Sequence, residues 1–216
     1  MEIKKILILS VLFSTLTFFL GLAVGYMINN YLFNIIYRDY WNLKLMVDSA
    51  HYLLREEIVC DKTLFHTLTD YLESVGRRIE ILQESKSIYV SKEVFKLYKA
   101  EYFNLEYLHY LLANKYINNC NETFAIIFFF YDDSKPCNEC KKEGYQLSYL
   151  KAKYMDNLLI YSFDISYENA YIQYYARKYN LTEVPSIILF IKNESYVFRG
   201  FTKYNEIENI LSKYLS

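Results

Sequence analysis

The feature that most constrains this chain is an N-terminal stretch without charged residues, which runs from Ile6 to Tyr37. Its first part, Ile6–Ile28, is almost continuously apolar, and as a helix it would be about 35 Å long at about 1.5 Å per residue. That length is enough to cross the roughly 30 Å hydrocarbon core of a bilayer. The sequence therefore predicts that residues 1–37 form a short N-terminal tip and a transmembrane helix that anchors the protein.

The charges that flank this stretch predict its orientation. Two lysines precede it, whereas the first charge after it is Arg38. Because cytoplasmic flanks are enriched in lysine and arginine, we expect the N-terminus in the cytoplasm and residues 38–216 outside. The alternative is a cleaved signal peptide, since Ala23-Val24-Gly25 has the small residues of a cleavage site. The apolar run continues past this site, which favours a single-pass protein of the cell membrane with an extracytoplasmic C-terminal part.

The amino-acid composition argues against several classes of protein. The chain has 24 basic and 25 acidic side chains and a formal net charge of -1, which argues against a nucleic-acid partner. It contains only 5 glycines and 2 prolines, so collagen-like, low-complexity and linker-like chains are excluded and turn-rich all-β folds are disfavoured.

The segment after the apolar stretch has the pattern of helices. From Arg38 to Ile117, apolar residues recur every three or four positions, which is typical of one buried helix face. Three helices fit this pattern, over about 38–58, after Asp61 and from Ser91. We interpret residues 38–120 as an all-α spacer of three helices, the last two packed as an antiparallel hairpin. The three histidines of the chain all lie here, away from any cysteine or carboxylate cluster, and are interpreted as core or surface residues.

Residues 121–216 have a different pattern of apolar residues, typical of alternating strands and helices. Thr123–Tyr131 (TFAIIFFFY) is too continuously apolar for a surface strand, which indicates a strand covered on both faces. The predicted elements that follow are a helix over about 138–154, a strand over Leu158–Asp164, a helix over about 168–178, strands over Ser186–Ile191 and Tyr196–Arg199, and a helix over about 204–215. This β-α-β-α-β-β-α order is typical of a small α/β domain.

A pair of cysteines stands where the first of these strands gives way to the first helix, in the run Cys137-Asn138-Glu139-Cys140. Two thiols at this spacing can close a small disulfide ring, and a helix N-terminus stabilises the thiolate of the first. Later in the chain, Val184-Pro185-Ser186 leads directly into an apolar strand, where a cis-proline would lie beside the disulfide. Together these two motifs predict a redox-active centre.

With these motifs the chain resembles the thioredoxin superfamily over residues 121–216. The run Tyr175–Phe190 resembles the passage from the second helix of that family into its cis-proline strand, and Tyr196–Phe201 resembles its edge hairpin, with Gly200 at the hairpin glycine. The resemblance implies that Cys137 is the attacking thiolate, that Cys140 is the resolving thiol, and that Val184 and Pro185 shape the substrate groove. It also implies thiol–disulfide exchange through a mixed disulfide, without a cofactor or a metal.

The sequence departs from the family around the cysteines. Pro136 replaces the usual tryptophan before the first cysteine, and Tyr131 replaces the buried acid expected near the end of the first strand. Glu139 should raise the pKa of the thiolate, whereas Lys141 and Lys142 should lower it. The direction of exchange, whether reduction, oxidation or isomerisation, therefore stays open.

The remaining cysteines, Cys60 and Cys120, flank the predicted hairpin at the same end. This placement favours a structural disulfide between them, which suits an exported domain. The alternative is a zinc site that uses all four cysteines. Against it, the strand that follows Cys120 would separate it from Cys137 by roughly 25–30 Å.

The sequence leads to two hypotheses of different kinds. The first is a membrane-anchored extracytoplasmic oxidoreductase that exchanges thiols and disulfides with exported proteins and with an unidentified electron donor or acceptor. The alternative is a redox-inactive thioredoxin-like module for binding or assembly in a membrane complex, with the helical segment as its docking surface.

Overall fold

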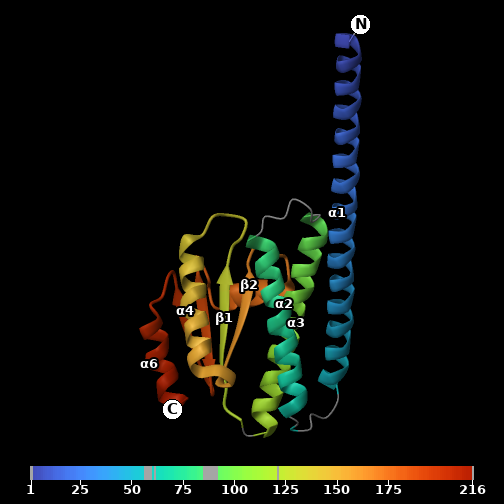
Figure 1. The fold of residues 1–216 in the computed structure, drawn as a ribbon. Coiled ribbons are helices and arrows are strands. Elements are labelled where there is room, and N and C mark those ends of the chain that lie inside the picture. The colour runs from blue at the N-terminus through green and yellow to red at the C-terminus, as the bar shows by residue number, and fades with distance from the viewer. Residues whose placement is uncertain (1, 56–59, 61, 85–91, 121, 216) are drawn as a thin grey trace.

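The computed structural model describes residues 2–55, 60, 62–84, 92–120 and 122–215. Within these residues, one helix, α1 (Glu2–Arg55), is long and apolar enough to cross a membrane. Its first half stands clear of the rest of the molecule (Figure 1), and the side chains of residues 3–31 are exposed. Its second half lies along the remaining helices.

Helix α1 runs without a break through the expected boundary between residues 37 and 38. We expected a separate helix over about 38–58, but neither glycine nor proline occurs between Gly25 and Arg55, so no helix-breaking residue separates the two parts. Ile36 is the first buried side chain described along α1. The side chains of Leu43, Val47 and Ala50 continue the same buried face. The apolar stretch and the first part of the helical segment are therefore one element.

The other two helices of this segment are α2 (Lys62–Glu84) and α3 (Lys92–Cys120). They lie side by side next to α1 (Figure 1). The expected first residues of these helices, Asp61 and Ser91, lie outside the described residues. At Gly76, an added Cβ would be 2.8 Å from the hydroxyl oxygen of Tyr102. A glycine at this position therefore leaves room for the hydroxyl end of Tyr102 from α3.

The rest of the chain forms a mixed four-stranded sheet with the order β2-β1-β3-β4. Its strands are β1 (Ala125–Tyr131), β2 (Leu158–Asp164), β3 (Ser186–Ile191) and β4 (Glu194–Arg199). β1 and β2 are parallel, whereas β3 is antiparallel to both β1 and β4. The helices between and after them are α4 (Asn138–Tyr154), followed by the short 3-10 helix η1 (Met155–Asn157), α5 (Ala170–Lys178) and α6 (Tyr204–Tyr214).

The predicted elements agree closely with these bounds, and the differences have local causes. β1 begins two residues later than predicted because its pairing starts at Ala125, opposite Leu158 on β2 and Ile191 on β3. β4 begins two residues earlier than predicted, because Glu194 already pairs with Ile191 across the hairpin. Hydropathy marks where apolar residues lie, whereas the strand ends are set by pairing.

The two faces of the sheet are covered by different helices. Ala125, Ile127 and Phe129 point into one apolar layer with residues of α4 and α6. The alternate residues of β1, Ile126 and Phe128 among them, point into a larger layer formed with α1, α2, α3 and α5. The helical segment is therefore part of the core of the sheet and does more than space it from the apolar helix.

A series of buried, hydrogen-bonded side chains also joins the helices to the sheet. His109 on α3 is 2.7 Å from the hydroxyl oxygen of Tyr161 on β2 and 3.0 Å from Oγ1 of Thr69 on α2. Burial lowers the pKa of His109 to about 4, so the ring is neutral near pH 7. This matches the interpretation of His109 as a core histidine. The positions of His51 and His66 give no indication of a further role.

Candidate functional site

Cys137 and Cys140 are joined by a disulfide at the N-terminus of α4, with an S–S distance of 2.03 Å and a Cα–Cα distance of 5.2 Å. Cys137 is the N-cap residue of this helix, and its Sγ accepts a hydrogen bond from the backbone N–H of Cys140 at 3.1 Å. Cys140 is only 8% exposed, whereas Cys137 is intermediate between buried and exposed. An incoming thiolate therefore reaches the sulfur of Cys137 more readily than that of Cys140.

The loop between β1 and α4 brings the pair to the end of the sheet. Asp132 turns the chain directly after β1, because its Oδ1 accepts a hydrogen bond from the backbone N–H of Ser134 at 2.8 Å. Hydrogen bonding from Ser134, mainly from its hydroxyl, lowers the pKa of Asp132. Pro136 follows in exposed backbone just before the N-cap. This position is compatible with proline, which needs no hydrogen-bond acceptor.

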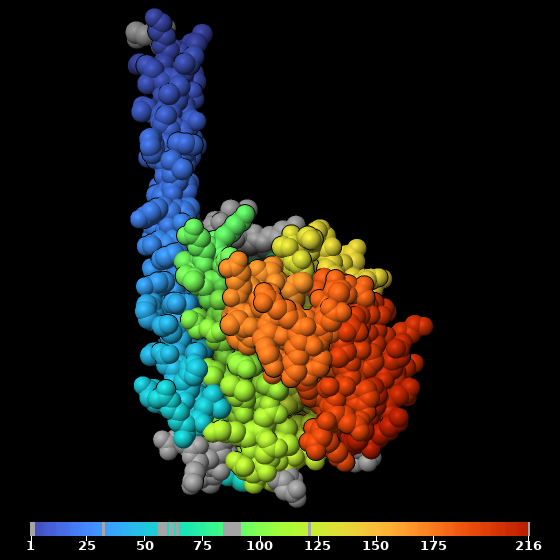
Figure 2. Space-filling view, turned by 180° about the vertical axis from the view of Figure 1, so that it is seen from behind, coloured from blue at the N-terminus to red at the C-terminus, as the bar shows by residue number. Residues whose placement is uncertain are grey.

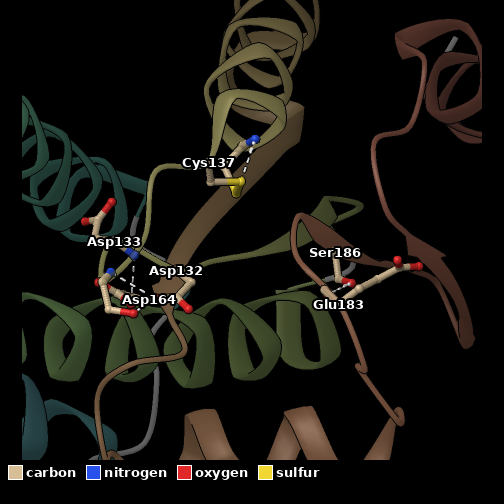
Figure 3. The surroundings of a disulfide bond; sticks show 8 residues. Asp132, Asp133, Cys137, Asp164, Glu183 and Ser186 are labelled. Carbon is tan, nitrogen blue, oxygen red and sulfur yellow. Dashed lines mark hydrogen bonds between the residues drawn. A yellow bond between two sulfur atoms is a disulfide. The ribbon is translucent and has the colours of Figure 1, made fainter.

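A second loop faces the disulfide from the start of β3. The peptide bond between Val184 and Pro185 is cis, and Pro185 is buried. Val184 and Cys137 pack against the same apolar layer, to which Cys140 also belongs. Figure 3 shows the next residue, Ser186, across from the disulfide, where its hydroxyl donates to the carbonyl oxygen of Glu183 at 2.7 Å.

The loop after β4 lies next to this one. Gly200 has a φ of 69°, a conformation that residues with a Cβ rarely adopt. A Cβ built on it would lie 3.6 Å from Oε1 of Glu183. The structure thus brings Gly200 beside the loop that carries Val184 and Pro185.

A buried ion pair lies beneath the loop that leads to Cys137. Lys99 on α3 places its Nζ 3.0 Å from Oδ2 of Asp164 at the end of β2, and both side chains are almost fully buried. Lys99 also donates to Asp133 in the loop, and Figure 3 shows Asp133 and Asp164 close together below Cys137. Asp164 Oδ1 accepts from the hydroxyl of Ser166 at 2.7 Å. Helix α3 therefore helps to hold the loop that carries the cysteines.

Tyr131 occupies the position where the family resemblance led us to expect an acid. Burial raises its pKa well above the usual value for tyrosine, and the nearby carboxylate of Asp133 acts in the same direction. Its phenol is therefore neutral, and the Nζ of Lys99 lies 5.1 Å from its ring centroid. The buried acid near the end of β1 is instead Asp164, which lies at the end of the neighbouring strand β2.

Glu143 is another buried acid that the sequence analysis did not single out. It lies one helical turn after Cys140 on α4 and is fully buried. Its Oε2 accepts a hydrogen bond from the backbone N–H of Thr202 at 2.8 Å, whereas Oε1 has no hydrogen-bond partner among the described residues. Burial raises the pKa of Glu143 to about 7. The spacing of Cys140, Glu143 and Leu147 along one helix face was the signal that could have revealed it.

Cys60 and Cys120 form the second disulfide, with a Cα–Cα distance of 5.5 Å and a separation of 60 residues along the chain. Cys120 precedes β1 and Cys137 follows it, so the two disulfides lie at opposite ends of this strand. All four cysteines are thus disulfide-bonded in the structure, which differs from the arrangement that the zinc alternative requires. Among the described residues, no group of three or more histidine, cysteine, aspartate or glutamate side chains is placed to hold a metal ion.

No family model and no curated protein sequence matches the chain. Among solved structures, a protein described only as malarial is similar at 20% identity and a TM-score of 0.37, over 43% of this chain and 99% of its own. Thioredoxin-2, described as a component of the protein secretion machinery of the malaria parasite, is similar at 18% identity and a TM-score of 0.37, over 43% of this chain and 84% of its own.

A third similar structure is Deadhead, a germline-specific thioredoxin of Drosophila melanogaster, at 18% identity and a TM-score of 0.35, over 47% of this chain and 92% of its own. A mixed sheet with the order β2-β1-β3-β4, covered by α4 and α6 on one face, has a thioredoxin-like α/β arrangement. A helical N-terminal part precedes this arrangement.

Proposed function

We propose that this protein is a membrane-anchored thiol–disulfide oxidoreductase whose redox-active centre is Cys137 and Cys140. The observation that carries the proposal is the asymmetry of this pair at the N-terminus of α4. Cys137 is partly exposed and Cys140 is buried, so one sulfur can meet a partner while the other resolves the intermediate. Free backbone N–H groups and the helix dipole favour a thiolate at the N-cap position.

When the centre starts oxidised, the partner reduces it in two steps. A thiolate of the partner attacks Sγ of Cys137, the Cys137–Cys140 bond breaks, and Cys140 leaves as a thiolate. A second thiol of the partner then attacks the partner's sulfur in the mixed disulfide and releases Cys137. Two electrons and two protons move from the partner to the pair, and the partner gains one disulfide. The reverse sequence reduces a disulfide of the partner.

The proposed location follows from α1. The apolar run Ile6–Ile28 would span the bilayer, with the N-terminus in the cytoplasm and the cysteines outside. The Cys60–Cys120 disulfide is compatible with an oxidising compartment. The partners would be thiols and disulfides of exported proteins, together with an electron donor or acceptor.

The test is exchange with a disulfide-containing protein such as insulin and with a dithiol peptide, using full-length protein in vesicles. We expect Cys137→Ser to abolish both reactions. We also expect Cys140→Ser to accumulate a mixed disulfide that dithiothreitol releases, because the resolving thiol is missing. The matched control is Cys60→Ser/Cys120→Ser, which removes the other disulfide and should retain exchange.

If the wild-type protein exchanges disulfides in neither direction, the oxidoreductase proposal fails. That outcome would favour the alternative hypothesis of a thioredoxin-like module for protein contacts.

A further inference from the structure

The end of the sheet that carries the cysteines points the same way as the free half of α1. In Figure 1, the N-terminal half of α1 and the loop between β1 and α4 both lie at the upper end of the molecule. Figure 2, seen from behind, shows the same relation, with the residues near 135 at the end from which α1 projects. If α1 crosses a bilayer, the cysteine pair faces that bilayer.

Contacts between the helices give the height of the site along α1. Arg78 Nη1 on α2 lies 3.0 Å from Asp39 Oδ2 on α1, which puts these residues at about one level. Gln83, five residues further along α2, donates to Asp133 in the loop before Cys137. Five residues are about 7.5 Å of helix, so Asp133 lies about level with Asn34 of α1.

A second set of contacts gives an independent estimate. Lys44 Nζ on α1 lies 3.8 Å from Glu101 Oε1 on α3. Lys99, which contacts Asp133, is two residues or about 3 Å closer to the N-terminus of α3. By this route Asp133 lies about level with Asn42. The two estimates place the loop between the levels of Asn34 and Asn42.

The site is therefore close to the end of the apolar run. From Ile28 to the levels of Asn34 and Asn42 the distance along α1 is about 9–21 Å at about 1.5 Å per residue. The headgroup layer on each side of a bilayer is roughly 5–8 Å thick, so the loop lies about 1–16 Å beyond its outer edge. The helix is continuous across this interval and is held against the core from Ile36 onward, so it leaves no flexible linker that could carry the site away.

Exposed aromatic side chains of α1 mark the same level. They follow the apolar run and project from the helix at Tyr31, Phe33, Tyr37 and Trp41. Aromatic residues of this kind are enriched where a transmembrane helix passes the headgroups. Their position indicates that the domain begins at the membrane surface.

We infer that the partner of the Cys137–Cys140 centre is a membrane-bound protein that presents its cysteines close to the outer edge of the headgroup layer, rather than an exported protein that diffuses freely. The inference rests on the proposed function for its chemistry and on the fold for its geometry. A disulfide at this height is accessible to cysteines next to the bilayer, whereas a large soluble protein must fit between the domain and the headgroups.

The geometry is tested without any enzymatic readout. In full-length protein reconstituted into phosphatidylcholine vesicles, a fluorophore on Cys137 of the Cys140→Ser variant should be quenched by spin-labelled headgroups. The matched control is a fluorophore at Ala152→Cys in the Cys137→Ser/Cys140→Ser background, since this exposed residue lies about 22 Å further along α4. We expect quenching at Cys137 to be several-fold stronger, and equal or weaker quenching there would overturn the inference.

The partner class is tested by the rate of exchange with one dithiol peptide, either tethered to a lipid headgroup or free in solution. Seven helix-forming residues inserted between Asn30 and Tyr31 would raise the domain by about 10 Å and rotate it by only about 20°. We expect the tethered rate to fall at least tenfold and the free rate to stay the same. The same insertion between Ile3 and Lys4, before the apolar run, should change neither rate.

An unchanged tethered rate in the first insertion variant would contradict the inference. If neither peptide reacts with any variant, the proposed function itself fails, while the quenching result still reports the orientation of the site.

Discussion

Glu143 is a fully buried carboxyl group on α4, one turn after Cys140. Its only hydrogen-bond donor in the described structure is the backbone N–H of Thr202, and burial outweighs this donor in raising the pKa of Glu143 to about 7. The folded protein therefore binds a proton at Glu143 over a range of pH in which the unfolded chain, with a pKa near 4.5, has released it.

This difference predicts a pH dependence of stability with a definite sign. The contribution of Glu143 is fully present below about pH 4.5 and is lost as the pH rises through about 7, because the folded state must then bury a charge. At about 1.4 kcal/mol per pKa unit, a shift from 4.5 to about 7 corresponds to a loss of at most about 3.5 kcal/mol. Urea unfolding of the full-length protein in mild detergent at pH 5 and pH 8 measures it.

Glu143→Gln provides the comparison, because glutamine keeps an acceptor for the N–H of Thr202 and cannot ionise. We expect the wild type to lose more stability than this variant between pH 5 and pH 8. Burial of His109 acts with the opposite sign, since its lowered pKa of about 4 makes folding less favourable as the pH falls. His109 is present in both proteins, so its effect cancels in the difference. Equal losses in both proteins would show that Glu143 is not buried as described.

Among the elements, the Cys60–Cys120 disulfide connects the start of α2 to the end of α3. It closes a loop of 60 residues at the end of the sheet opposite the redox pair. Cross-linking a loop of this size restricts the unfolded chain, which typically stabilises the folded state by about 2–4 kcal/mol.

We therefore expect Cys60→Ser/Cys120→Ser to lower the free energy of unfolding by about 2–4 kcal/mol. Exchange by Cys137 and Cys140 should persist at temperatures below the new unfolding midpoint. Unfolding curves of the variant and of the wild type in detergent, both without reductant, measure the difference. An unchanged midpoint would mean that α2 and α3 are held together by packing alone.

Much of the fold could be predicted at the scale of elements, because the information for each element is local. The strand Leu158–Asp164 and the helix at 138–154 have clear hydropathy patterns and end where predicted. The two motifs at Cys137 and Val184 are also local. Their predicted roles remain predictions, although the structure brings the two loops onto one apolar layer.

What could not be predicted depends on contacts between distant segments. Lys99 and Asp164 form an ion pair although they are 65 positions apart in the sequence. No local sequence pattern predicts a buried ion pair at that separation. The periodicity of α3 showed that one of its faces is buried but not that this face covers the sheet. We therefore interpreted residues 38–120 as a spacer, although α3 packs in the same core as β1.

In the whole molecule, the core shared by the helical segment and the sheet extends across the predicted domain boundary at residue 120. Large side chains are buried on the face of the sheet toward the helical segment. Among the described helices after β1, α5 is the one that contributes to this layer. These side chains include Ile126, Phe128, Phe130, Tyr161 and Phe163. Each contributes about 1.5–3 kcal/mol when fully buried, so partial exposure of the set rivals the roughly 5–15 kcal/mol net stability of a typical domain.

We therefore expect a fragment of residues 121–216 to lack a cooperative unfolding transition and to bind a hydrophobic dye. A fragment of residues 34–216 keeps the packed half of α1 with α2 and α3, and should unfold cooperatively. Near-ultraviolet circular dichroism during urea titration distinguishes the two. If residues 121–216 unfold at the same urea concentration as the longer fragment, the helical segment is a separate spacer after all. In that case the support that Lys99 gives to the cysteine loop would also be dispensable for the redox site.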